Sequence, residues 1–152
     1  MNKKNKIKNK VFKSTIKHIG NKGLTKFSLG KSIKKFLIDN SRTSEIVVNG
    51  YKMQLDKNDV MQLSLFDYEP IETELFKKEI KDGDIVVDIG ANIGYFTLLM
   101  AKLVGINGKI ISFEPEPSNF TLLNKNVIIN NYQNVTLEKK GISDYNGRCK
   151  FF

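Results

Sequence analysis

Two glycines and two carboxylates lie near the ends of consecutive expected strands. Gly90 and Gly94 follow the apolar run 85–89, and Asp88 lies near the end of that run. Glu114 directly follows the next apolar run. Glycine allows a sharp turn and a close backbone approach, and open α/β sheets bind ligands at such strand-to-helix turns. The pattern therefore predicts a ligand site at residues 88–94, with Glu114 beside it.

The residues around this turn disfavour a phosphate ligand. A dinucleotide fingerprint would need glycines at positions 92 and 95, which hold Asn92 and Tyr95, so a nicotinamide-dependent oxidoreductase is poorly supported. A phosphate loop ending in Gly-Lys-Ser/Thr is absent, and no Lys or Arg lies between Asp84 and Met100. Carboxylates accept hydrogen bonds from ribose hydroxyls and attract cations. S-adenosylmethionine, which carries a sulfonium and an ammonium but no phosphate, fits these residues best.

A structural alternative exists for each carboxylate. Asp88 could cap the following helix, and Glu114 could be a solvated strand end. Both acids occur together with both glycines at matching strand ends, and this combination favours the ligand site.

Regular alternation of strands and helices would position the turn. Strands are expected at 85–89, 109–113 and 134–139, and helices at 71–80, 94–104 and 117–130. This order predicts an α/β fold with a parallel sheet and right-handed crossovers. Further expected elements are a helix through 29–37, a strand at 60–66, and hairpins around Asn49-Gly50 and Asn146-Gly147.

Charge divides the chain unevenly. Residues 1–40 hold 12 of the 25 basic residues but only one of the 16 acidic residues, Asp39. Such an arm could contact nucleic acid or an anionic lipid surface, although it could equally be a solvated Lys/Asn-rich lead-in. We therefore expect a basic arm at 1–40, a hairpin and lead-in segment at 41–69, and a partial Rossmann-like domain that binds S-adenosylmethionine at 70–152.

The single cysteine and the single histidine suggest no further chemistry. Cys149 has no partner for a disulfide within the chain, which suits a reducing cytoplasm. His18 is far from it in sequence, and the two do not form a metal-ligand pattern. No apolar run approaches the roughly 18 residues needed to span a bilayer. We expect a cytoplasmic protein with no bound metal.

Residues from about 60 to 152 resemble the FkbM-type methyltransferases, a branch of the Rossmann-like S-adenosylmethionine enzymes. The resemblance is carried by Tyr68-Glu69-Pro70, the run from Asp82 through Asp88-Ile89-Gly90-Ala91-Asn92-Ile93-Gly94 to Thr97, Phe113-Glu114-Pro115, Asn134-Val135-Thr136-Leu137 and Gly141-Ile142-Ser143-Asp144. It implies O-methylation of a sugar, glycolipid or natural-product hydroxyl, with nucleic acid an unlikely partner.

The resemblance also implies roles for individual residues. The turn with Gly90, Ala91, Asn92 and Gly94 would hold the methionine end of the cofactor, and Glu114 would hold the ribose hydroxyls. Pro115 and the segment around Ile142 would border the adenine, and Tyr68 would lie over the cofactor end of the site. Asp88 is included among the expected cofactor-binding residues.

The sequence departs from the FkbM pattern in its length. The family fold continues with further strands after the third, including the one expected to face the methyl acceptor. We therefore expect a fragment with little activity alone, whose strand at 85–89 is an open edge available for pairing with another chain. No catalytic base can be assigned, since Asp144 better suits a turn. The alternative function is a non-catalytic module that binds S-adenosylmethionine or acts through its basic arm.

Overall fold

The computed structural model describes residues 44–56 and 68–148. Its elements are β1 (Glu45–Val48), β2 (Tyr51–Gln54), α3 (Pro70–Glu79), β3 (Ile85–Ile89), α4 (Tyr95–Val104), β4 (Lys109–Phe113), α5 (Pro117–Ile129) and β5 (Val135–Glu138). The alternation expected from residue 70 onward is confirmed, as is the hairpin at Asn49-Gly50. The basic arm, the helix at 29–37, the strand at 60–66, His18 and Cys149 lie outside the described residues.

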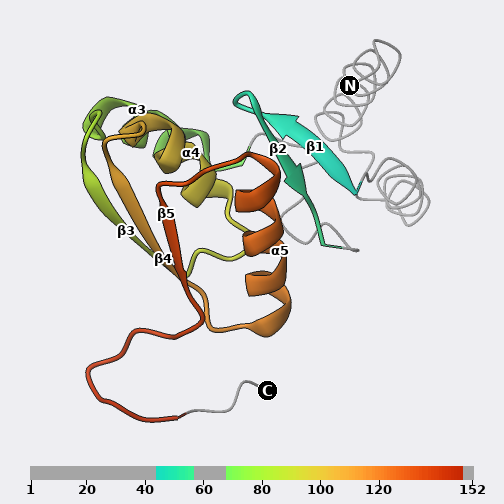
Figure 1. Cartoon of the computed structure of the whole chain (residues 1–152), viewed down its shortest axis with the longest axis vertical. Helices are drawn as coiled ribbons and strands as arrows, with labels where there is room; N and C mark the ends of the chain where they lie inside the picture. The colour runs from blue at the N-terminus through green and yellow to red at the C-terminus, as the bar shows by residue number, and fades with distance from the viewer. Residues whose placement is uncertain (1–43, 57–67, 149–152) are drawn as a thin grey trace, which may run out of the picture.

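The three later strands form a parallel sheet in the order β3-β4-β5 (Figure 1). In this register Ile85 pairs with Lys109, and Ile110 pairs with Val135. The carboxyl ends of all three strands therefore meet at one edge of the sheet. The α/β class is confirmed, and β3 is an outer strand of the sheet that the structure describes.

Local sequence sets where the helices begin and end. Pro117 opens α5, and the carboxylate of Glu116 caps it by accepting the Asn119 N–H at 2.6 Å. Gly94 precedes α4 with φ of +95°, a conformation that glycine adopts without steric cost. At the other end of α4, the side chain of Asn134 donates to the carbonyls of Ala101 and Gly105. Asn134 thereby satisfies carbonyls that a helix end would leave unpaired.

One face of the sheet is covered by α4 and α5, and the β1–β2 hairpin packs against α5 (Figure 1). The core there contains Leu98 and Val104 from α4, Ile110 from β4 and Leu123 from α5, all with no exposed surface. Dense packing of this kind makes each methylene group count toward stability. The sequence supplies it by placing apolar residues at helical spacing in α4 and Ile110 at a covered position of β4.

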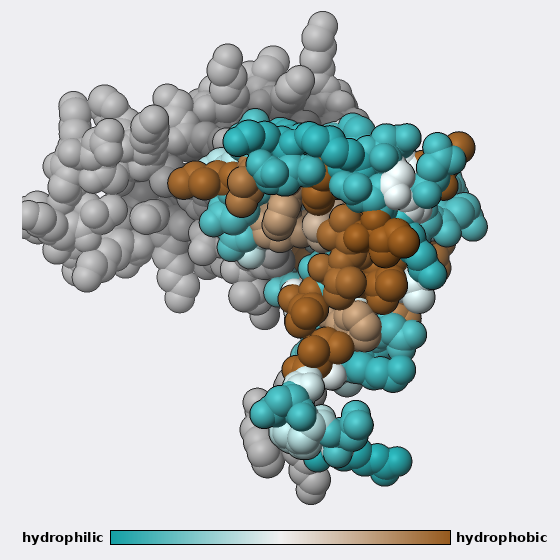
Figure 2. Space-filling model, turned by 90° about the vertical axis from the view of Figure 1, so that its left-hand side faces the viewer, coloured by the Kyte–Doolittle hydropathy of each residue, from teal (hydrophilic) through white to brown (hydrophobic). Residues whose placement is uncertain are grey.

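The opposite face of the sheet is open and apolar. Alternate residues of β3 lie on it, and Ile85, Val87 and Ile89 expose 72%, 54% and 63% of their surfaces. Figure 2 shows a hydrophobic patch in the middle of this side of the molecule. Parallel sheets are usually covered on both faces, so this patch is unusual for such a sheet.

The β1–β2 hairpin belongs to the same core as the sheet domain. Tyr51, Met53 and Leu55 alternate inward and are buried with Leu98 and Leu123. The hydroxyl of Tyr51 donates to the Tyr95 carbonyl at 3.3 Å, and burial raises the pKa of this phenol. The boundary expected between residues 69 and 70 therefore does not separate two hydrophobic cores, although the three-part division itself stays a prediction.

The segment after β5 lies apart from the sheet. Residues 139–148 contain no strand, and they leave the sheet as an extended segment (Figure 1). All of these residues are exposed. The second strand of the hairpin expected around Asn146-Gly147 would include residues 149–152, which lie outside the described residues, so this hairpin stays a prediction.

Candidate cofactor-binding site

The turn between β3 and α4 has an unusual backbone. Gly90, Asn92 and Gly94 have φ values of +79°, +52° and +95°. A Cβ added to Gly94 would lie 2.7 Å from Cδ1 of Leu123, so packing also requires glycine there. A Cβ added to Gly90 would meet nothing within 4 Å, so this stretch of backbone faces open space that a ligand can enter.

Hydrogen bonds fasten the turn to the end of β4. The N–H groups of Gly90 and Ala91 both donate to the Phe113 carbonyl, at 2.9 and 3.0 Å. The Gly94 N–H donates to the Ala91 carbonyl, and the Asn92 N–H donates to the Glu114 carboxylate. These four N–H groups therefore have partners within the chain. The expectation that N–H groups of this turn hold the cofactor's carboxylate stays a prediction, because binding there would exchange one of these partners.

Glu114 is a buried carboxylate at the carboxyl end of β4. It exposes 5% of its surface, and its two oxygens accept the N–H groups of Asn92 and Glu116, each at 2.8 Å. An ionised carboxylate offers about four lone-pair sites, so these bonds leave acceptor capacity on both oxygens. Glu114 is thus fixed in position beside the open backbone of Gly90. The pair suits a ligand that presents hydroxyl donors.

Asp88 is bonded to α4. Its carboxylate accepts the Thr97 hydroxyl at 2.5 Å, and Thr97 lies 3.1 Å from the Ser112 hydroxyl on β4. Burial raises the pKa of Asp88; the Thr97 hydrogen bond lowers it, and the nearby Glu114 charge raises it further. In this conformation the carboxylate joins β3 to the first turn of α4, and its direct contact with cofactor stays a prediction.

The remaining expected site residues border the same end of the sheet. The ring of Tyr68 packs edge-on against Tyr95, with ring centroids 5.0 Å apart. A Cβ built on Gly141 would lie 3.8 Å from Pro115, which brings the segment with Ile142 beside Pro115. Ile142 is 53% exposed, so its side chain is available for contact. Tyr68 thus adjoins the first residue of α4, and the segment with Ile142 adjoins Pro115; their roles toward the cofactor stay predictions.

Sequence reasoning missed three buried polar residues that support the turn: Thr97, Ser112 and Asn126, each with no exposed surface. Thr97 bonds to Asp88, Ser112 bonds to Thr97, and Asn126 on α5 donates to the Ile93 carbonyl. Their sequence signal is weak but present. Polar residues inside apolar runs must find hydrogen-bond partners when they are buried.

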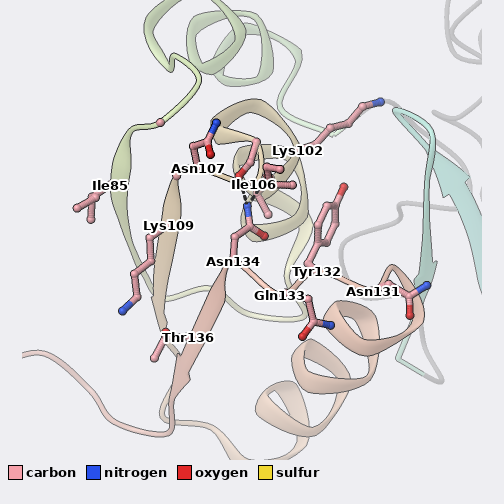
Figure 3. Close-up of a pocket in the computed structure, with 14 residues that line it drawn as sticks. Ile85, Lys102, Ile106, Asn107, Lys109, Asn131, Tyr132, Gln133, Asn134 and Thr136 are labelled. Carbon is pink, nitrogen blue, oxygen red and sulfur yellow. Dashed lines mark hydrogen bonds between the residues drawn. The ribbon is translucent and has the colours of Figure 1, made fainter.

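A separate cavity of about 850 Å³ lies at the opposite edge of the sheet, where the strands begin. Figure 3 shows that its side chains diverge: Ile85, Lys102 and Lys109 point in different directions. Asn134 in its wall is occupied with the end of α4, and Lys102 donates to the Asn49 carbonyl at 2.7 Å. This arrangement supplies no convergent set of groups for a ligand.

Neither 44–56 nor 68–148 contains three or more His, Cys, Asp or Glu residues grouped as a metal site would require. No helix within those ranges is both long enough and apolar enough to cross a bilayer.

Comparison with protein families identifies the fold's relatives. The model of the TRM5/TYW2 methyltransferase domain matches residues 45–147, which include the hairpin, the turn and Glu114. The chain belongs to this family. Its cofactor is therefore S-adenosylmethionine, in agreement with the expectation from the turn. The fit is physical as well, since Glu114 retains acceptor capacity for ribose hydroxyls and the Gly90 backbone is open.

Individual relatives agree with this assignment. A probable ribosomal RNA small subunit methyltransferase A from Methanosphaera stadtmanae is 32% identical over 99 residues, covering 65% of this chain and 35% of the relative. TYW2 of P. horikoshii, solved in complex with MeSAdo, is 28% identical with a TM-score of 0.52, covering 68% of this chain and 38% of that one. TYW2 of M. jannaschii, solved with AdoMet, is 24% identical with a TM-score of 0.51, covering 63% and 43%, and supports the fold. The chain spans about a third of the length of the curated relatives it matches.

The family match corrects two expectations. The FkbM assignment is wrong, because residues 45–147 match the TRM5/TYW2 domain. The glycine turn and Phe113-Glu114-Pro115 were expected to bind the cofactor, and a cofactor pattern does not distinguish enzymes that differ in acceptor. The expectation of a glycan-type acceptor, with nucleic acid unlikely, is wrong for the same reason, since the family members TYW2 and Trm5 act on tRNA.

Proposed function

We propose that this chain forms the cofactor-holding part of an S-adenosylmethionine-dependent methyltransferase that acts on RNA, with tRNA as the favoured class. The family match supports the tRNA class, and the similarity to a probable ribosomal RNA methyltransferase supports RNA more broadly. Because the chain covers about a third of its curated relatives, both the activity and the acceptor are proposals.

The observation that carries the cofactor part of this proposal is the geometry of Glu114. Its carboxylate is 5% exposed, is held by two backbone N–H groups, and adjoins the unobstructed backbone of Gly90. Charge-assisted hydrogen bonds to a preorganised carboxylate are stronger than neutral ones. Two vicinal ribose hydroxyls would be matched by the two oxygens of Glu114, without rearrangement of the strand end.

The other residues of the site orient the cofactor and shield it. Tyr68 and the Pro115–Ile142 pair flank the turn, and Asp88 with Thr97 fixes the start of α4. When bound, the cofactor supplies an activated methyl group on its sulfonium. The contribution of this chain is to hold the donor in a fixed orientation, and alignment of donor and acceptor provides a large part of the rate of such a displacement.

The Lys-rich arm supplies a sequence feature that suits RNA. Residues 1–40 carry 12 lysines and one acid, which is a charge balance typical of segments that bind phosphate backbones. An arm of this kind would add affinity without reading bases, so its contribution should weaken as salt concentration rises. Anionic lipid would be an alternative partner with the same charge requirement.

Calorimetric titration with S-adenosylmethionine tests the cofactor site. We expect the 152-residue protein to bind, and we expect Glu114→Gln to weaken binding by about tenfold or more, because it removes the charge that strengthens bonds to hydroxyls. Glu138→Gln is the matched control, since Glu138 ends the neighbouring strand and pairs with Lys140. Equal affinity in the wild type and in Glu114→Gln, with both folded, would contradict the site.

The acceptor is tested on the same preparation by transfer of a labelled methyl group from S-adenosylmethionine. Unmodified tRNA, ribosomal RNA fragments and double-stranded DNA are compared at matched phosphate concentration. We expect incorporation or salt-sensitive binding with tRNA to exceed that with DNA. Cofactor binding without any preference for RNA would leave the cofactor site standing and remove the RNA proposal.

A further inference from the structure

Two asparagines, Asn126 in α5 and Asn130 at its C-cap, bond to the hairpin as a third strand would. Asn130 accepts the Lys52 N–H at 2.9 Å and donates to the Lys52 carbonyl at 2.7 Å. Asn126, one helical turn earlier, accepts the Gln54 N–H at 2.7 Å and donates to the Gln54 carbonyl at 3.0 Å. The two side-chain amides thereby satisfy alternate residues along the edge of β2 that faces away from β1.

Asn126 also bonds to the turn between β3 and α4, residues 90–94, which we call the cofactor turn. None of the bonds described for Asn130 reaches this turn. The second hydrogen of its amide donates to the Ile93 carbonyl at 2.8 Å. Ile93 lies between Asn92 and Gly94, both of which have positive φ, and its side chain is 1% exposed. Asn126 itself has no exposed surface. One buried amide therefore joins the hairpin, α5 and the turn.

The energetic consequence differs between the two asparagines. Removing Asn130 unpairs backbone groups of Lys52 in an exposed setting, where water can replace the side chain. Removing Asn126 leaves the buried Ile93 carbonyl without this partner in a turn that already contains three left-handed residues. An unpaired buried polar group is costly, so the turn would shift to recover a partner.

We propose that Asn126 is a positioning residue for the cofactor turn and that the β1–β2 hairpin contributes to cofactor affinity through it. This inference rests on the proposed cofactor role of the turn. Asn126 acts through the Ile93 carbonyl, which holds the backbone between Gly90 and Gly94, and the adjacent Asn92 N–H reaches Glu114. The hairpin, far from the turn in sequence, is thereby connected to the part of the site that fits ribose.

The matched pair Asn126→Ala and Asn130→Ala tests the proposal in the full chain. Both variants lose hairpin bonds, but Asn126→Ala alone loses the described bond to the turn. At a temperature where both are folded, we expect Asn126→Ala to bind S-adenosylmethionine about tenfold more weakly, and Asn130→Ala to change affinity by less than about threefold. Equal losses in the two variants would mean that Asn126 is merely structural and would overturn the proposal.

Hydrogen–deuterium exchange separates this proposal from the cofactor assignment. We expect faster exchange of amides in residues 90–94 in Asn126→Ala than in Asn130→Ala, measured without cofactor. Faster exchange with no cofactor binding by the wild type would refute the cofactor role and, with it, the proposal as stated. Unchanged exchange and unchanged affinity would refute the positioning role alone. If Asn126→Ala does not fold, Asn126→Asp keeps the size and the acceptor for Gln54 but lacks the amide donor, and the same outcomes apply.

Discussion

The two faces of the three-stranded sheet have similar residue types but opposite environments. On the face covered by α4 and α5, Ile110 has no exposed surface, whereas Ile85 on the other face exposes 72%. Both are isoleucines in adjacent paired strands of one parallel sheet. The difference shows that an apolar strand pattern specifies a potential core, and that burial depends on which elements pack over it.

The polar residues of the two faces also differ in their environments. The covered face contains Asp88 and Ser112, which are linked through Thr97. The open face presents Lys109 and Glu138 near its margins, and Glu138 pairs with Lys140 in an accessible position. Polar residues on the covered face therefore have to be hydrogen-bonded by the chain, whereas those on the open face can be hydrated. Removing a hydrogen-bond partner should therefore cost more stability on the covered face than on the open face.

The largest expected effect compares Ile110→Ala with Ile85→Ala. The first removes methylene groups from a fully buried position, and we expect the free energy of unfolding to fall by about 2–5 kcal/mol. The second removes the same atoms from an exposed position, and we expect a loss below about 1 kcal/mol. Urea unfolding monitored by circular dichroism measures both. Similar losses would mean that the open face is covered in solution.

A smaller loss of stability is expected from a change at Gly94, the residue that precedes α4. Gly94→Ala places a Cβ 2.7 Å from Leu123 and forces alanine to a φ of +95°, so we expect a loss of about 1–3 kcal/mol. Gly90→Ala is the control, because its φ of +79° is also unfavourable but its Cβ meets no atom within 4 Å. The difference between the two variants in thermal unfolding measures the packing of α5 on the turn. Equal losses would show that backbone strain alone explains both.

The sequence predicts the positions of the strands better than it predicts which of their side chains are buried. Strands β3 and β4 were predictable to the residue, because Ile85–Ile89 and Lys109–Phe113 are apolar runs bounded by glycines or acids. The turn between β3 and α4 was predictable because Gly90 and Gly94 adopt positive φ without steric cost.

Other features could not be read from local sequence. The inward direction of Asp88 depends on which face α4 covers, because both faces of β3 are apolar in sequence. The docking of the hairpin depends on Asn126 and Asn130, whose four-residue spacing is a signal only when their partner strand is known. The family was misassigned because motifs that are expected to bind the cofactor do not depend on the methyl acceptor.

The smallest expected effect concerns the charge on the covered face. Burial raises the pKa of Asp88 above its ordinary value, so the folded state binds this proton more tightly than the unfolded state. The resulting stability is fully present below the unfolded pKa of about 4, and it is lost as pH rises through the folded pKa.

Asp88→Asn removes this titration while keeping an oxygen to accept the Thr97 hydroxyl. We therefore expect the stability of Asp88→Asn relative to wild type to increase as pH rises from about 4 to 7, measured by urea unfolding at each pH. A difference between Asp88→Asn and wild type that stays constant with pH would mean that Asp88 is solvated, and that polar groups are treated alike on the two faces of the sheet.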